Sequence, residues 1–279
     1  MSASTSPLSL PVIVTRLRAA GCVFAEDEAH LLISEARTPT DLVTMVDRRA
    51  VGVPLEHVLG WAEFCGLRIA VDPRVFVPRR RTEFLVHQAA ALARPRAVVV
   101  DLCCGSGAVG AALAAALGRV ELHAADIDLA AVRCARRNIP AAVGQVYEGD
   151  LYDPLPTMLW GRVDVLAVNA PYVPTEAIEL MPPEARIHEP RAALDGGADG
   201  LDVQRRVAAA APLWLAPGGH LLIETSDRQA RQTAATFARN GLIPRVVSSD
   251  ELDATIVIGS RPALQNGGSG PGRARSSTT

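Results

Sequence analysis

Short apolar runs alternate with segments of helical periodicity from about residue 83 to residue 260. The runs, rich in Val, Leu and Ile, predict buried strands at 98–101, 120–125, 144–148, 163–168, 219–224, 242–247 and 255–259. Apolar residues at helical spacing predict helices at 83–93, 107–117, 129–138, 201–215 and 227–239. Strands separated by helices indicate an α/β fold with a mainly parallel, doubly wound sheet, in which ligands bind at the carboxyl ends of the strands.

The first third of the chain has a different pattern. Residues 12–50 carry apolar positions at roughly helical spacing and predict short helices, with Asp41 as the N-cap of one of them. Residues 64–77 predict a β-hairpin whose turn is the Asp-Pro-Arg at 72–74. Thr82 is the expected N-cap of the next helix. At the other end, residues 261–279 are Gly, Ser, Pro and Arg without periodicity, which predicts a disordered tail.

The composition narrows the class of protein. A chain of 279 residues with 49% hydrophobic content is long enough for one large domain and a smaller one. The net charge of −2 gives no electrostatic basis for a nucleic-acid partner. Five Cys without CxxC spacing favour a reducing compartment and neither a disulfide framework nor a metal site. Because no signal sequence and no long apolar run occurs, we expect a cytoplasmic protein without a membrane partner.

A Gly-containing loop joins the first strand of the predicted sheet to an Ala-rich helix. Its sequence is Asp101-Leu102-Cys103-Cys104-Gly105-Ser106-Gly107. The two glycines let the backbone turn sharply and approach a ligand closely. The spacing differs from the Gly-x-Gly-x-x-Gly of dinucleotide binders, since the next glycine is at position 110. Taken alone, the loop is equally consistent with a structural turn.

Acidic residues come directly after the next two strands. Asp126 ends the second strand, where an acid can accept hydrogen bonds from both hydroxyls of a ribose. Asp150 lies just beyond the third strand and can meet an adenine amine, while Leu151 packs on the ring. Each acid alone is consistent with helix capping or solvation, and we interpret Asp128 as an N-cap. A Gly loop and two acids at successive strand ends form a more specific series, which predicts a nucleoside-bearing ligand.

The fourth strand ends in Asn169-Ala170-Pro171-Tyr172. The Asn169 side-chain oxygen and the Ala170 carbonyl can each accept one N–H of a planar NH2 group, while the Tyr172 ring stacks on its plane. Such bonds leave the nitrogen lone pair available, which suits alkylation of an amide or an exocyclic amine. Asn-x-Pro is also common in turns, so the tetrapeptide alone decides nothing.

The sequence patterns that would indicate a metal site, a serine nucleophile or a phosphate site are weak. The six His are scattered without metal-ligand spacing, and His123 and His220 are interpreted as satisfied residues of strands. Ser106 lacks the Gly-x-Ser-x-Gly frame of a nucleophile elbow. The Arg79-Arg80-Arg81 run is consistent with phosphate binding and equally with a solvated loop.

Together these motifs resemble the class I S-adenosylmethionine-dependent methyltransferases, and specifically the protein N5-glutamine methyltransferases of the HemK/PrmC group. Further segments carry the resemblance from about residue 54 to 260. They are Pro54 to Gly60 with the adjacent Ala62-Glu63-Phe64-x-Gly66-Leu67, then Val77-Pro78-Arg79-x-x-Thr82-Glu83, and His188 to Gly200 after the fourth strand.

The resemblance implies a seven-stranded Rossmann-like class I methyltransferase sheet, with a small N-terminal helical domain and a connecting β-hairpin. The implied boundaries are 1–60 for the helical, substrate-recognising domain, 61–83 for the linker and hairpin, and 84–260 for the methyltransferase domain. It implies S-adenosylmethionine as the cofactor, bound by Asp101, Cys103, Cys104, Gly105, Ser106, Gly107, Asp126, Asp150, Leu151 and Asn169. Asn169, Ala170, Pro171 and Tyr172 are the implied catalytic motif.

The implied reaction is methylation of a glutamine side-chain amide. The implied partner is a peptide chain release factor, at its Gly-Gly-Gln loop, or another Gln-bearing protein. Two other functions fit parts of the pattern. An N6-adenine methyltransferase also has to hold a planar NH2 group, that of a flipped base. A methyltransferase fold that only binds its protein partner is the other alternative.

The chain departs from the family pattern at several places. The usual tetrapeptide is Asn-Pro-Pro-Tyr, whereas Ala170 stands at its second position. The accepting carbonyl belongs to the backbone and is kept, so we expect looser preorganisation with retained chemistry. Arg80 replaces a proline, adding positive charge near the mouth of the site. Cys103 and Cys104 stand where Gly and Thr are usual, and their thiols are expected to point away from the cofactor. The N-terminal part is also shorter than usual.

Overall fold

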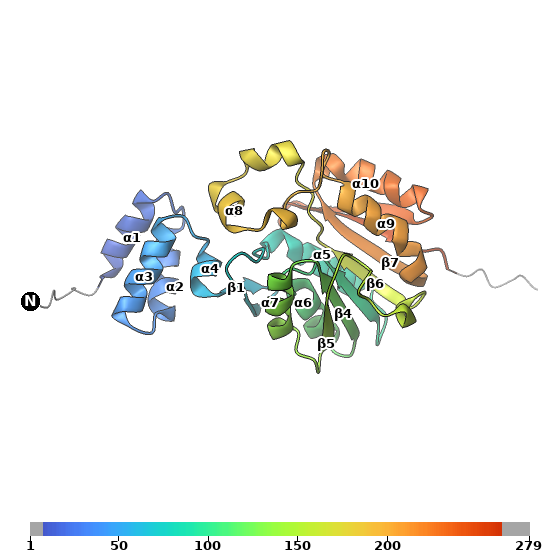
Figure 1. Cartoon of the computed structure of the whole chain (residues 1–279), viewed down its shortest axis with the longest axis horizontal. Helices are drawn as coiled ribbons and strands as arrows, with labels where there is room; N and C mark the ends of the chain where they lie inside the picture. The colour runs from blue at the N-terminus through green and yellow to red at the C-terminus, as the bar shows by residue number, and fades with distance from the viewer. Residues whose placement is uncertain (1–7, 264–279) are drawn as a thin grey trace, which may run out of the picture.

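The computed structural model describes residues 8–263, which form a helical N-terminal part beside a larger α/β part (Figure 1). The helices are α1 (Leu10–Ala19), α2 (Ala25–Glu35), α3 (Pro39–Ala50) and α4 (Leu55–Leu59). They share a hydrophobic cluster of their own, in which Ile13, Leu17, Leu32 and Val46 are fully buried.

Helix α3 begins earlier than the sequence pattern predicts. Thr38 is its N-cap, with a hydroxyl that accepts the Asp41 N–H at 3.1 Å, and Pro39 takes the first helical position. The carboxylate of Asp41 accepts the Arg37 N–H at 3.0 Å instead of capping a helix of its own. The prediction of Asp41 as N-cap was therefore wrong, because Thr-Pro is the stronger start signal.

The predicted hairpin exists, but its turn lies elsewhere. Strands β1 (Trp61–Phe64) and β2 (Leu67–Ala70) pair antiparallel through Cys65 and Gly66, whose φ angles are 49° and 72°. Two successive positive φ angles match the tight turn that suits a twisted hairpin. The predicted turn at 72–74 was wrong as a hairpin turn. The Asp72 carbonyl instead accepts the Val75 N–H at 3.1 Å, and the chain then runs to a short 3-10 helix, η1 (Arg80–Thr82).

The large sheet has seven strands in the order β5-β4-β3-β6-β7-β9-β8. They are β3 (Val98–Leu102), β4 (Glu121–Asp126), β5 (Gly144–Glu148), β6 (Val163–Val168), β7 (Leu215–Thr225), β8 (Ile243–Ser249) and β9 (Ala254–Ser260). The β7–β9 and β9–β8 pairs are antiparallel, and the other pairs in this sheet are parallel. The predicted fold class is confirmed. The strand order reverses between β3 and β6, so a ligand crevice is expected at their carboxyl ends.

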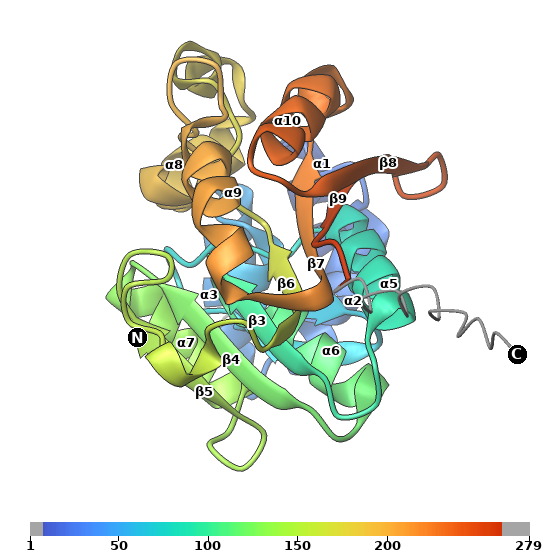
Figure 2. The same cartoon turned by 90° about the vertical axis from the view of Figure 1, so that its right-hand side faces the viewer.

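Helices cover both faces of the sheet (Figures 1 and 2). One face packs against α5 (Glu83–Leu92), α6 (Ala108–Leu117) and α7 (Leu129–Asn138). The other packs against α9 (Asp202–Trp214) and α10 (Asp227–Arg239), together with a short 3-10 turn, η2 (Thr157–Leu159). The central strands β3, β4, β6, β7 and β9 are largely buried, which explains their apolar runs, whereas the edge strands β5 and β8 are partly exposed.

The segment between β6 and α9 contains short helices rather than a strand. They are η3 (Thr175–Leu180), α8 (Pro183–His188) and η4 (Arg191–Ala193). In Figure 1 this segment lies above the sheet, between the N-terminal helices and α9. Two ion pairs join the N-terminal helices to later parts of the chain. Arg49 meets Glu184 of α8 at 3.2 Å, and Arg68 of β2 meets Glu35 of α2 at 2.6 Å.

The C-terminal segment leaves the sheet later than predicted. The Arg261 N–H donates to the Gly219 carbonyl at 2.9 Å, and the Arg261 carbonyl accepts the Gly218 N–H at 3.0 Å. Arg261 therefore continues the sheet, and the tail predicted for 261–279 lies mostly outside the described residues, from 264 onward. Within residues 8–263 no helix is both long and apolar enough to cross a membrane.

Candidate functional site

A cavity of about 370 Å³ opens at the carboxyl ends of β3, β4 and β6, where the sheet topology predicts a crevice. It brings together the Gly loop, the two acids at the neighbouring strand ends, and the tetrapeptide that ends β6. The predicted residues that line it are Asp101, Cys103, Cys104, Gly105, Ser106, Asp126, Asp150, Leu151, Asn169, Ala170, Pro171 and Tyr172. Gly107 is the exception, because it begins α6 and packs against Ala135 of α7.

Asp126 is fixed by the backbone on both of its oxygens. Its Oδ2 accepts the Gly105 N–H at 2.8 Å and its Oδ1 accepts the Asp128 N–H at 2.9 Å. Burial raises the pKa of Asp126, and these backbone hydrogen bonds partly lower it. Each carboxylate oxygen keeps a second lone pair, so the side chain still has acceptors for ligand hydroxyls. Asp128 caps α7, as predicted, by accepting the Ala130 N–H at 2.8 Å.

Asp101 supports the Gly loop through a hydrogen bond to the helix that follows the loop. It is 1% exposed, and its Oδ2 accepts the Gly110 N–H at 2.8 Å in the first turn of α6. A Cβ at position 110 would lie 3.1 Å from that oxygen, so the close approach favours glycine. Burial raises the pKa of Asp101 to about 7. This role of Gly110 was not predicted, because the glycine was compared only with the spacing of dinucleotide binders.

Asp150 is paired with a residue that the sequence did not point to. Its Oδ2 lies 2.6 Å from Nη2 of Arg206, which projects from α9. Both side chains line the cavity, and the neighbouring Leu151 is buried with a φ of 49°. One oxygen of Asp150 is therefore occupied, while the other is available to a ligand amine.

The tetrapeptide after β6 is held by side chains from distant elements. The Nδ2 of Asn169 donates to the Thr82 hydroxyl at 3.4 Å, and no described residue donates to its Oδ1. The Tyr172 hydroxyl donates to Glu224 Oε1 at 3.5 Å, and burial raises the pKa of Tyr172 to about 12. Thr82 stands at the N-cap position of α5, as predicted, but makes no capping bond because its hydroxyl faces Asn169.

Two of the three consecutive arginines pair with buried carboxylates. Arg79 Nη2 lies 2.6 Å from Glu189 Oε1, and Arg81 Nε lies 3.8 Å from Glu224 Oε1. Arg79 is partly buried, so the solvated-loop interpretation does not describe it, whereas Arg81 is 45% exposed and fits that interpretation. Arg80 is exposed and has no such pair among residues 8–263. Burial raises the pKa of Glu189, and the Arg79 charge opposes that effect.

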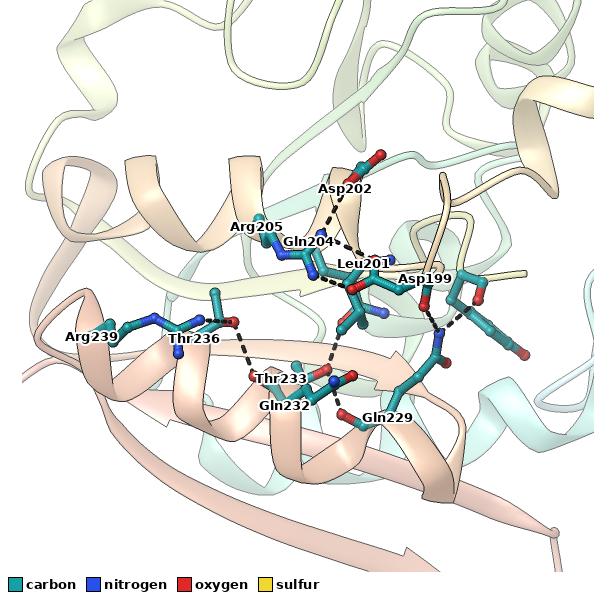
Figure 3. Close-up of polar contacts among 11 residues, drawn as sticks. Asp199, Leu201, Asp202, Gln204, Arg205, Gln229, Gln232, Thr233, Thr236 and Arg239 are labelled. Atoms are coloured by element: carbon teal, nitrogen blue, oxygen red, sulfur yellow. Dashed lines mark hydrogen bonds and ion pairs between the residues drawn. The ribbon is translucent and has the colours of Figure 1, made fainter. Parts of the chain in front are cut away.

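The glycine-rich end of the segment after β6 packs directly on the backbone of the tetrapeptide. Gln229 of α10 donates through Nε2 to the Tyr172 carbonyl at 3.0 Å and to the Asp199 carbonyl at 2.9 Å. A Cβ at Gly200 would lie 2.2 Å from the Tyr172 oxygen. Figure 3 shows Gln229 in a polar network that continues through Thr233, whose hydroxyl donates to Gln204 of α9 at 2.8 Å. Gln229 of α10 therefore holds the Tyr172 backbone, and the network links α10 to α9.

The two strand histidines that were interpreted as satisfied have hydrogen-bond partners. His123 Nδ1 lies 3.0 Å from the Tyr147 hydroxyl, and His220 Nδ1 lies 2.9 Å from the Ser260 hydroxyl. Cys103 and Cys104 pack with the two hydrophobic clusters of the sheet, and burial raises the pKa of both thiols. Among the described residues no group of three His, Cys, Asp or Glu could hold a metal ion.

Comparison with known proteins places this geometry in a family. Residues 69–240 match the methyltransferase small domain family. The chain is 39% identical to the release factor glutamine methyltransferase of Geobacter sulfurreducens over 219 residues, which are 78% of this chain and 76% of that protein. The chain belongs to the release factor glutamine methyltransferase family. A second member, from Mycolicibacterium smegmatis, is 37% identical over 231 residues, 81% of this chain and 82% of that protein.

A solved structure is similar to this chain in fold. The methyltransferase from Pyrococcus furiosus aligns with a TM-score of 0.54 and 17% identity, over 71% of this chain and 90% of that chain. The sequence relatives confirm the family resemblance, and this structural likeness agrees with the class I methyltransferase sheet.

The residues along the cavity fit the cofactor that the resemblance implies. Gly105 has a φ of 55° and no atom within 4 Å of where a Cβ would lie, so its backbone is open to a ligand. Asp126 provides acceptors at the end of β4, where a ribose would lie, and Leu151 offers an apolar surface beyond the end of β5. For S-adenosylmethionine, Asp126 would hold the ribose and Asp150 the adenine amine.

Proposed function

We propose that this protein transfers a methyl group from S-adenosylmethionine to the side-chain amide nitrogen of a glutamine in a peptide chain release factor. Membership of the family supports the reaction. One observation supports its site: the Asn169 amide donates its NH2 to Thr82, and among residues 8–263 nothing bonds its oxygen, in the same cavity as Asp126. A free acceptor at the end of β6 is what a substrate NH2 group requires.

The cofactor, when bound, supplies the electrophilic methyl group. This chain has to overcome the poor nucleophilicity of an amide nitrogen, whose lone pair is conjugated with the carbonyl. Asn169 and the Ala170 carbonyl accept the two N–H bonds of the substrate amide, and the Tyr172 ring packs on its plane. These hydrogen bonds strengthen as positive charge develops on the nitrogen, so catalysis comes from positioning and electrostatic support.

The surroundings of the tetrapeptide suit a small protein loop. The cavity that contains Asn169 is also lined by apolar side chains from three parts of the chain, namely Phe64, Phe76, Met181 and Leu194. A Gly-Gly-Gln segment has no bulky side chain next to its glutamine, so it can bring that side chain into a narrow apolar cavity. We propose this loop as the substrate.

Radiolabelled methyl transfer tests the function. The protein is incubated with S-adenosylmethionine carrying a tritiated methyl group and with a release factor, its Gly-Gly-Asn variant or DNA. The expected result is label in the release factor and none in the variant or in DNA. Label in DNA would support an N6-adenine methyltransferase, and cofactor binding without any label would support a non-catalytic binding protein.

Replacement of Asn169 tests the site. The Asn169→Ala variant loses the side-chain acceptor but keeps Asp126 and the Gly loop. We expect its turnover on the release factor to fall by about 100-fold or more, as when a single preorganised hydrogen-bonding group is removed. Its affinity for S-adenosylmethionine, measured by calorimetry, should stay within about twofold of the wild-type value. Near-normal turnover would show that the tetrapeptide does not hold the substrate amide.

A further inference from the structure

A buried carboxylate lies behind the tetrapeptide, and the proposed chemistry does not use it. Glu224 is 2% exposed and stands near the carboxyl end of β7. It comes directly after Ile223, the register partner of Val168, and so lies beside Asn169. Its Oε1 faces the Tyr172 hydroxyl at 3.5 Å, and its Oε2 is buried without a hydrogen-bond partner among residues 8–263. A buried carboxylate oxygen without a partner is costly, so its retention calls for a role.

Thr82 connects this carboxylate to Asn169. The Thr82 side chain is 2% exposed, and its hydroxyl accepts the Asn169 Nδ2–H at 3.4 Å. The same hydroxyl is close to the Glu224 carboxyl, and its presence there lowers the pKa of that carboxyl. A hydroxyl has one proton to donate, a carboxylate can only accept, and an amide NH2 can only donate. Because the Thr82 oxygen accepts from Asn169, its own proton is free for an acceptor, and the Oε2 of Glu224, which has no partner among residues 8–263, can take it.

We propose that Thr82 and Glu224 are positioning residues that hold the Asn169 amide with its oxygen toward the substrate. This inference rests on the proposed function and deepens it. The two flips of a side-chain amide have the same shape and differ only in their hydrogen bonds. A flipped Asn169 would present NH2 to the substrate NH2, which repels it. Inside the protein it would place Oδ1 against Thr82 and draw the hydroxyl proton away from Glu224.

The charge of Glu224 sets the direction of these hydrogen bonds, so the groups that face it matter. Arg81 of η1 lies 3.8 Å away and Tyr172 lies 3.5 Å away, while its register partner on β9, Ile256, is apolar. Burial raises the pKa of Glu224, and Thr82, Arg81 and Tyr172 lower it in part. The carboxylate form is lost as the pH falls through a pKa above the usual value for Glu. Turnover should then decline on the acidic side.

A pair of substitutions at Thr82 separates the hydroxyl from its packing. Thr82→Val keeps the shape and removes the hydroxyl, whereas Thr82→Ser keeps the hydroxyl and removes the methyl group. Thr82→Val should lower kcat on the release factor by about 10- to 100-fold, the effect of one hydrogen bond to a charged group. Thr82→Ser should stay within about threefold of wild type, and both should bind S-adenosylmethionine normally. The matched control is Thr255→Val, which removes a buried hydroxyl of β9 that contacts Ser248.

Glu224→Gln tests the charge. Gln can donate to Thr82 and so removes the fixed direction of the hydrogen bonds. We expect a lower kcat and a pH profile that no longer shows the acidic decline due to Glu224. We also expect unchanged or higher thermal stability at pH 8, because a buried charge has been removed. A residue needed only for packing would give lower stability and an unchanged pH profile.

A readout without turnover separates this inference from the proposed function. The side-chain 15N–H signals of Asn169, assigned by their loss in Asn169→Asp, report its hydrogen bonds in the free protein. They should shift in Thr82→Val and Glu224→Gln and stay in place in Thr255→Val. Unchanged signals, or full activity in Thr82→Val with a loss in Thr82→Ser, would overturn the positioning role. Absence of methyl transfer by the wild-type protein would instead overturn the proposed function and leave the NMR test to decide this one.

Discussion

Position 170 holds an alanine where the family resemblance predicts a proline. Ala170 is 1% exposed, and its N–H makes no hydrogen bond to another described backbone group. A proline there would thus lose no donor, and the accepting carbonyl would stay. The alanine therefore leaves the tetrapeptide backbone less preorganised, while the groups that hydrogen-bond to the substrate stay the same.

Ala170→Pro should accordingly keep or modestly raise turnover on a release factor. Stability should rise by about 0.4–1 kcal/mol, because the unfolded chain becomes less flexible. Steady-state kinetics and thermal unfolding of both forms provide the measurement. A large loss of turnover in a folded, cofactor-binding Ala170→Pro protein would indicate a pocket reshaped for another substrate.

Asp126 is the residue to which cofactor affinity should be most sensitive. Removing its carboxylate in Asp126→Ala takes away two acceptors for ribose hydroxyls. Affinity for S-adenosylmethionine should fall by about 1.5–3 kcal/mol, the range for hydrogen bonds to a charged group. Calorimetry on the variant measures this, with Asp227→Ala at the start of α10 as the control for loss of an acid elsewhere. Equal affinity in both variants would remove Asp126 from the cofactor site.

At the residue scale, the sequence predicted those site residues that come directly after a recognisable strand. Asp126 and Asn169 were predicted because each comes at the end of an apolar strand, and parallel strands bring their ends together. Thr82, Glu224 and Arg206 were not, since each reaches the site from a distant part of the chain. Thr82 is 87 positions from Asn169, and no local pattern records that contact. Because Thr82 was interpreted as an N-cap, its hydroxyl was not expected to face Asn169.

At the scale of elements, the apolar runs predicted every strand of the large sheet, and the central strands gave the clearest runs because they are buried on both faces. The hairpin shows the limit of this approach. Asp-Pro is a strong turn signal, yet the hairpin turns at Cys65-Gly66, where two positive φ angles match the strand twist. The short helices between β6 and α9 were also missed. They carry little periodicity and are held by contacts with other elements.

Gly200 is the point at which one of these irregular segments touches the site. Gly200→Ala should displace the Tyr172 backbone, because the new methyl group would lie 2.2 Å from its carbonyl oxygen. The expected result is a loss of turnover of about tenfold or more, together with lower stability. Gly241→Ala is the matched control, since its φ of 78° is like the 77° of Gly200 but no atom lies within 4 Å. Equal turnover in the two variants would show that the contact does not position Tyr172.

At the scale of the whole molecule, buried carboxyl groups set the response of stability to pH. Burial raises the pKa of Asp101, Asp126, Glu189 and Glu224. An acid whose folded pKa is raised gives stability that is present at low pH and is lost as the pH rises through that pKa. For Asp101 the folded value is about 7, well above the usual value of 3.8. Burial lowers the pKa of His57 and His220, which opposes this trend below about pH 6.5.

The free energy of unfolding should therefore rise by about 1 kcal/mol from Asp101 alone as the pH falls from about 8 to about 6.5. Asp101→Asn keeps an acceptor for the Gly110 N–H and removes the titration, so this rise should be smaller in the variant. Urea unfolding at a series of pH values measures it. An identical pH dependence in wild type and Asp101→Asn would show that Asp101 does not titrate in this range.

The contact between Arg49 and its two acids limits how this protein can be recombined with its relatives. Arg49 is buried in α3, donates to Glu28 of α2 at 2.6 Å, and meets Glu184 of α8 at 3.2 Å. A chimera joined at residue 60 would combine helices from one parent with the α8 segment of another. Where the parents differ at positions 49 and 184, the guanidinium would keep Glu28 and lose Glu184, which is 43% exposed, a loss of about 1 kcal/mol or less. Exchange of residues 1–60 together with 174–200 keeps Arg49 and Glu184 from the same parent. The segments that should be exchanged together are therefore not contiguous in the sequence.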